Sequence, residues 1–180
     1  MIEKTMFKRK NFFIAATSLQ ACALLYLAVP PMLTLTNGKT VTVQTEPVDP
    51  RDMFRGDYIT LEYGFSDVPS SVEYKYDDKV LVRLKPDGDK QWKPIEISKN
   101  KLTPGADELV LRGIVTYTNT RRRMVRVRYG IEQVFVPEGR GQNLSSADKI
   151  TIELAVPESG RAVIKRAQLK DDLLYRWRWL

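Results

Sequence analysis

Residues 109–136 of the chain read LVLRGIVTYTNTRRRMVRVRYGIEQVFV. Apolar and polar side chains alternate along most of this stretch, and alternation with a period of two residues is the pattern of a half-buried β-strand. The polar residues 119–123 interrupt the alternation. We therefore predict one strand over residues 109–118 and a second over residues 124–136.

Similar short runs occur on both sides of this stretch, separated by turn residues such as Pro86-Asp87-Gly88 and Pro104-Gly105. Their spacing of about ten residues is typical of an all-β sandwich or barrel. Further strands are predicted over residues 39–45, 57–63, 79–84, 92–97, 150–156, 162–168 and 173–179, and one short helix over residues 143–148. The predicted fold class is all-β, a mainly antiparallel sandwich or barrel-like domain that follows one N-terminal transmembrane α-helix.

The N-terminal segment has the properties of a membrane span. Between Lys10 and Lys39 lie 28 uncharged residues. Their apolar centre, residues 12–33, would reach about 33 Å as a helix, enough for a hydrocarbon core of about 30 Å. We expect Pro30-Pro31 to end the helix, because proline lacks the amide hydrogen of a helix interior. The basic cluster Lys8-Arg9-Lys10 favours a cytoplasmic N-terminus.

These features divide the chain into a cytoplasmic basic segment (residues 1–10), a transmembrane segment (residues 11–34) and an extracytoplasmic β-rich domain (residues 35–180). Two alternatives remain open for the apolar segment. It is a cleaved signal peptide if processing occurs at Ala21-Cys22-Ala23, and it belongs to a lipoprotein if Cys22 is lipidated. The apolar run continues to Leu27 and beyond, which favours a retained span, since the apolar region of a signal peptide is only about 7 to 15 residues long.

Composition excludes several classes of enzyme. The chain has no histidine and one cysteine, Cys22. A Ser-His-Asp or Cys-His hydrolase needs an imidazole, and zinc sites are usually built from His and Cys side chains. A disulfide within the chain is impossible. We predict no metal site and no cofactor. The net charge of +7 comes from 29 basic and 22 acidic residues, and the first ten residues, with four basic and one acidic, carry +3 of it. The remaining +4 is only mildly basic and does not indicate a nucleic-acid groove.

The predicted strand over residues 124–136 and the residues that lead into it carry an unusual number of positive charges, which form a candidate basic strip. Its residues are Arg121, Arg122, Arg123, Arg126 and Arg128. Arg126 and Arg128 fall on the same face of the strand. The strip is either a contact for an acidic partner or anionic lipid, or a solvated edge whose charges discourage strand pairing.

Residues 47–63 read PVDPRDMFRGDYITLEY and contain the pattern G-D-Y-x-x-L-x-Y between Gly56 and Tyr63. This stretch resembles the block after which the bacterial GDYXXLXY family is named. Residues 129–141, YGIEQVFVPEGRG, and Gly160-Arg161-Ala162 resemble two further blocks of that family. The resemblance covers about residues 20–170.

The resemblance implies a membrane-anchored bacterial protein of a family without an assigned reaction, often encoded beside polytopic membrane proteins. It places the chain in the cytoplasmic (inner) membrane with the C-terminal domain in the periplasm. The chain departs from the family pattern at Gln133-Val134 and Ser145-Ser146, so no carboxylate pairing near Ser145 is carried over.

The first block offers a candidate binding surface, together with the loop that follows residue 129. By the period of a strand, Ile59, Leu61 and Tyr63 share one face of the block. The candidate surface residues are Asp49, Arg51, Asp52, Arg55, Gly56, Asp57, Tyr58, Tyr63, Glu132, Glu138 and Arg140. The same residues also fit a rigid structural corner, in which prolines and aspartates fix the turn into a strand.

Three functions follow as hypotheses. The first is a membrane-tethered binding or assembly domain whose partner is a polytopic membrane protein. The second is a hydrolase that uses Asp49, Asp52, Asp57 or Glu138, with or without Mg²⁺ or Ca²⁺, for which carboxylates are suitable ligands. The third is a sensor of anionic lipid or cell-wall polymer through the basic strip.

Overall fold

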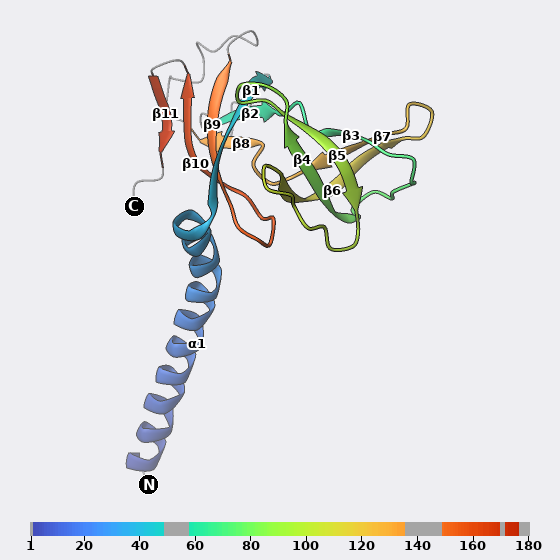
Figure 1. Ribbon diagram of the computed structural model, residues 1–180. Helices are drawn as coiled ribbons and strands as arrows, with labels where there is room; N and C mark the ends of the chain where they lie inside the picture. The colour runs from blue at the N-terminus through green and yellow to red at the C-terminus, as the bar shows by residue number, and fades with distance from the viewer. Residues whose placement is uncertain (1, 49–57, 136–148, 170–171, 177–180) are drawn as a thin grey trace.

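A computed structural model describes residues 2–48, 58–135, 149–169 and 172–176. Its described part contains one helix, α1 (Ile2–Asn37), followed by eleven strands. Figure 1 shows α1 as a single long rod that projects from a domain made of strands. The predicted fold class, all-β after one N-terminal helix, is therefore confirmed.

Helix α1 continues through Pro30 and Pro31 to Asn37, so the prediction that these prolines end the helix is wrong. The fixed φ angle of proline is compatible with a helix, and each proline removes one amide donor from the helical hydrogen bonds. Threonine hydroxyls bond to carbonyls of the last turns: that of Thr34 donates to the carbonyl of Pro30 at 3.0 Å, and that of Thr36 to the carbonyl of Met32 at 3.2 Å. The segment Asn11–Asn37 is long and apolar enough to cross a membrane, a test that signal sequences also pass.

The helix joins the domain without an intervening loop. Strand β1 (Lys39–Val48) begins two residues after α1 ends. Leu35 is only 2% exposed, and the end of α1 contacts strands β9 (Ile150–Val156) and β10 (Val163–Leu169). The amide of Gly38 donates to the carbonyl of Thr34 at 2.9 Å. The direction of the helix is therefore fixed relative to the domain by packing and by a hydrogen bond.

The strands form two sheets. The six-stranded sheet has the order β11-β10-β9-β1-β2-β8 and lies next to the end of α1 (Figure 1). Its remaining strands are β2 (Tyr58–Glu62), β8 (Gln133–Phe135) and β11 (Asp172–Arg176). All of its strand pairs are antiparallel, and the register of β1 places Val41 opposite Leu154 and Val43 opposite Ile152.

The five-stranded sheet has the order β3-β7-β6-β4-β5. Its strands are β3 (Asp67–Pro69), β4 (Lys79–Pro86), β5 (Trp92–Ser98), β6 (Leu109–Asn119) and β7 (Met124–Arg128). The two edge strands, β3 and β5, lie close to each other. The sheet therefore curls into a nearly closed barrel, which lies farther from α1 than the six-stranded sheet does (Figure 1).

A shared core and a few hydrogen bonds join the two sheets. Val82, Leu84 and Leu111 of the barrel belong to one buried cluster with Ile152 and Leu154 of the six-stranded sheet. The indole of Trp92 donates to the carbonyl of Thr42 at 3.1 Å, the amide of Gln44 donates to the carbonyl of Lys90 at 2.8 Å, and that of Arg112 to the carbonyl of Gly160 at 2.8 Å. The strands therefore form one folded unit.

The predicted strand over residues 124–136 is wrong in one respect, because it is two strands. Strand β7 pairs with β6 in the barrel, whereas β8 pairs with β2 in the other sheet. Gly130 between them has a φ of 83°, a conformation that breaks a strand and that glycine adopts at little cost. The three-residue strand β3 was not predicted. The predicted helix over residues 143–148 and the end of the predicted strand over residues 173–179 lie outside the described residues.

Candidate functional site

Much of the predicted binding surface lies outside the described residues, so the structure does not test it. This applies to Asp49, Arg51, Asp52, Arg55, Gly56, Asp57, Glu138 and Arg140. Tyr58 is described as the first residue of β2, where its backbone is opposite Phe135 of β8. The two regions predicted to form one surface are thus adjacent strands. Their described side chains, however, have structural roles.

Tyr63 belongs to the core, and its assignment to a binding surface is wrong. Its side chain is 2% exposed, and its hydroxyl donates to the carbonyl of Ile131 at 2.7 Å. The ring stacks on Phe65 with 5.0 Å between centroids. Its alternation with Ile59 and Leu61, which are both also buried, indicates the same inward face.

Phe65 and Tyr129 complete this aromatic cluster. The ring of Tyr129 meets that of Phe65 edge to face at 5.4 Å, and its hydroxyl donates to the carbonyl of Phe65 at 2.9 Å. Burial raises the pKa of both phenols, Tyr63 and Tyr129, well above the usual value for tyrosine. Both hydroxyls therefore stay protonated, and each serves as a donor to a buried carbonyl.

Glu132, which is half-buried, stabilises the turn that separates β7 from β8. Its carboxylate accepts hydrogen bonds from the amides of Tyr129 at 2.5 Å and Gly130 at 2.8 Å. Its own carbonyl accepts from the amide of Leu61 at 2.8 Å. Two backbone donors are thus satisfied by one carboxylate, which is why the chain can change sheets at this point.

The described part of the G-D-Y-x-x-L-x-Y pattern is therefore structural. Leu61 and Tyr63 point into the core, and their partners come from the second block, through Ile131 and Glu132. The two blocks are far apart in the sequence and are held together by buried hydrogen bonds.

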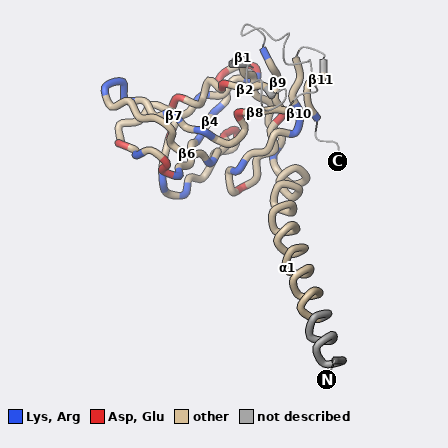
Figure 2. Tube along the Cα trace, turned by 180° about the vertical axis from the view of Figure 1, so that it is seen from behind, with Lys and Arg blue, Asp and Glu red and all other residues tan. Residues whose placement is uncertain are grey.

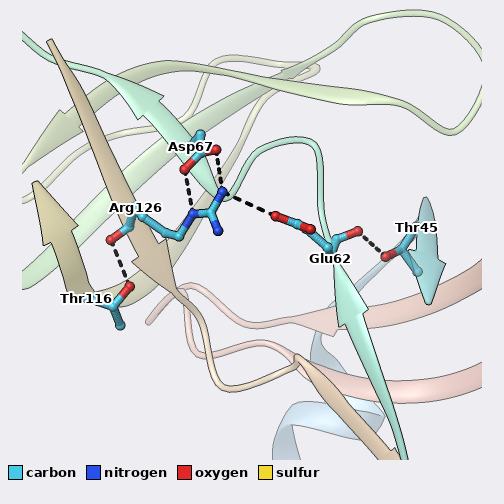
Figure 3. Close-up of polar contacts among 5 residues, drawn as sticks. All are labelled: Thr45, Glu62, Asp67, Thr116 and Arg126. Carbon is cyan, nitrogen blue, oxygen red and sulfur yellow. Dashed lines mark hydrogen bonds and ion pairs between the residues drawn. The ribbon is translucent and has the colours of Figure 1, made fainter. Parts of the chain in front are cut away.

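The basic strip is also divided by the structure. Arg126 forms a bidentate ion pair with Asp67, at 2.7 Å for both hydrogen bonds, and lies 3.2 Å from Glu62 (Figure 3). The hydrogen bond from Arg126 holds the pKa of Asp67 below its usual value. Arg126 thus links β2, β3 and β7, and its guanidinium, although exposed, is engaged by two carboxylates. Sequence reasoning missed Asp67 because the short strand β3 was not predicted.

The other four arginines of the strip remain exposed. Arg128 lies on β7 opposite Ile114 of β6. Arg121, Arg122 and Arg123 form the turn between β6 and β7, at the end of the domain away from α1, where Figure 2 shows a cluster of basic residues. A small open pocket of about 110 Å³ lies beside this turn, lined by residues 70–73 and by residues 118–120 and 123–125. No sequence pattern indicates this pocket, because its two walls come from segments that are distant in the sequence.

Within the described ranges, no group of three or more His, Cys, Asp or Glu side chains is placed to hold a metal ion. The carboxylates proposed for a hydrolase, Asp49, Asp52, Asp57 and Glu138, all fall outside those ranges.

Comparison with known proteins gives one match. No curated protein and no solved structure matches the chain. The family model described as "GDYXXLXY protein" matches residues 20–166, which include most of the apolar segment and nearly all of the two sheets. By this match over most of its length, the chain belongs to the GDYXXLXY protein family.

Proposed function

We propose that this protein is a membrane-anchored binding or assembly module, and that α1 and the β domain together dock on a polytopic membrane protein. In this proposal the N-terminus is cytoplasmic, as Lys8-Arg9-Lys10 favours. The domain lies in the periplasm of a bacterium, at the surface of the inner membrane.

The observation that carries the proposal is the direct junction between α1 and the domain. Leu35 is buried against the six-stranded sheet, and Gly38 closes the last helical turn. A domain held in this way has a fixed height and orientation above the bilayer. Such an arrangement favours recognition of another protein of the same membrane, whereas an enzyme that must reach diffusing substrates gains little from it.

The composition of α1 supports a partner inside the membrane as well. Gln20 is exposed on the helix and lies roughly 14 Å along the axis from Asn11, near the middle of a bilayer. A side-chain amide in lipid is costly unless it bonds to a neighbouring helix. The face of α1 next to Gln20 carries Thr17, Ala21 and Ala28. These three residues share one face because Ala21 and Ala28 follow Thr17 by four and eleven residues. Small residues at such positions allow close helix packing.

Substitution of Gln20 tests this proposal. Full-length protein is crosslinked in native membranes and purified, and the recovered proteins are identified. We expect a polytopic membrane protein with the wild type and roughly five-fold less of it with Gln20→Leu, because one interhelical hydrogen bond contributes about 1 kcal/mol.

The matched control is Cys22→Leu, which adds an apolar side chain at a similar depth on the opposite face of α1. Its recovery of the partner should equal that of the wild type. Equal recovery with Gln20→Leu and with the wild type, or recovery of only a second copy of this chain, would contradict the proposal.

A further inference from the structure

The pocket beside the β6–β7 turn has preformed walls. The amide of Ser70 donates to the carbonyl of Arg123 at 2.9 Å, which ties the segment after β3 to the turn. The hydroxyl of Thr118 donates to the carbonyl of Tyr74 at 2.9 Å, and the side-chain oxygen of Asn119 accepts from the amide of Arg122 at 3.0 Å. The two walls are thus fixed relative to each other before any ligand arrives.

The backbone of Arg123 is unusual for its residue type. Its φ is 51°, in the left-handed region that glycine adopts freely and that costs other residues energy. Arg123 is also the arginine of the turn that lines the pocket.

The pocket is rich in groups that can donate hydrogen bonds. The lining residues supply several such groups, among them the hydroxyls of Ser71 and Thr120, the side-chain amide nitrogen of Asn119 and the guanidinium of Arg123. Glu73 supplies one negative charge, whereas Arg121, Arg122 and Arg123 supply three positive charges. Unlike Arg126, these three arginines form no ion pair with any residue of the described ranges. The local field therefore favours an anion.

We propose that this pocket binds a phosphoryl group. Arginine guanidinium groups match the several oxygens of a phosphoryl group through paired hydrogen bonds, and hydroxyls complete such a site. The volume of about 110 Å³ admits one such group and not a whole polymer, so the rest of the ligand lies outside along the exposed arginines. The β6–β7 turn is at the end of the domain away from α1 (Figure 1), which favours a phosphorylated polymer over a headgroup of the protein's own membrane.

A pair of glycine substitutions isolates the guanidinium. Arg123→Gly removes the side chain and relieves the positive φ, so the fold should be retained or made slightly more stable. Lys90→Gly is the matched control, since Lys90 is also exposed, also cationic and also has a positive φ, of 58°. Lys90 lies between β4 and β5 and does not line the pocket.

Binding is measured with the full chain in a non-ionic detergent, against inorganic polyphosphate, inorganic phosphate, and vesicles of phosphatidylglycerol or of phosphatidylcholine. We expect polyphosphate to bind the wild type and Lys90→Gly about equally and Arg123→Gly at least ten-fold more weakly. Binding of phosphatidylglycerol vesicles that is also lost in Arg123→Gly would support the site and identify lipid as a source of the group.

Three outcomes would overturn the proposal. The first is an absence of polyphosphate binding by the wild type, and the second is unchanged binding in Arg123→Gly. The third is an equal loss of binding in Arg123→Gly and Lys90→Gly, which would indicate attraction by net charge alone. Recovery of the membrane partner proposed above does not involve this pocket and should be the same in Arg123→Gly and in the wild type.

Discussion

Phe65→Ala is expected to lower the free energy of unfolding by about 3–5 kcal/mol, the usual cost of removing a buried aromatic ring. Phe65 is 2% exposed and lies between the rings of Tyr63 and Tyr129. These two residues also donate hydrogen bonds to the carbonyls of Ile131 and Phe65. Loss of the central ring therefore disturbs the contacts that join the two sequence blocks, and thermal unfolding of the full-length protein in micelles measures the effect.

The control is Tyr76→Ala, which removes an aromatic ring that is 77% exposed. Its cost should stay within about 0.5 kcal/mol, as for most surface substitutions. If Phe65→Ala melted like Tyr76→Ala, the aromatic cluster would not be part of the folding core.

Gly38→Ala is expected to separate α1 from the six-stranded sheet or to lower the stability of the domain by about 1–3 kcal/mol, the usual cost of overpacking. A Cβ atom on Gly38 would lie 2.5 Å from the carbonyl oxygen of Thr34 and 3.0 Å from the amide nitrogen of Val156. Both neighbours are backbone atoms, which cannot move away without shifting the helix or β9. The melting temperature should fall, and trypsin should cleave faster after Lys39.

Gly64→Ala is the matched control, because no atom lies within 4 Å of a Cβ built on Gly64. This variant should melt and resist trypsin like the wild type. Unchanged melting and unchanged cleavage in Gly38→Ala would mean that the junction is loose and that the domain is not held at a fixed orientation.

The strands themselves could be predicted because one face of each is buried, and burial imposes the two-residue period seen in β4 and β7. The change of sheet after β7 could not, because alternation continues past Tyr129. It depends on the positive φ of Gly130 and on the carboxylate of Glu132, which accepts two amides. The periodicity of apolar residues reveals neither a backbone angle nor a side-chain hydrogen bond.

The end of α1 was misplaced for a related reason. A local rule about proline decided the prediction, whereas the helix is extended by a tertiary contact, the burial of Leu35 against the sheet. Tertiary packing commonly outweighs local propensity in this way.

The candidate site shows the same limit. The period of a strand placed Arg126 and Arg128 on one face correctly, but it could not show which acidic side chains pair with Arg126. Those partners, Glu62 and Asp67, come from β2 and β3. The pocket beside Arg123 depends likewise on a contact between Ser70 and a turn about fifty residues later.

Site-specific photocrosslinking inside the membrane is the sharpest test of whether α1 and its domain dock on another membrane protein. A photoreactive amino acid is placed at position 20 in one variant and at position 22 in another, on opposite faces of α1. The adducts formed in native membranes are then identified by mass spectrometry. We expect an adduct with a polytopic membrane protein from position 20 and adducts with lipid alone from position 22. Lipid adducts alone from both positions would mean that α1 does not dock on another membrane protein.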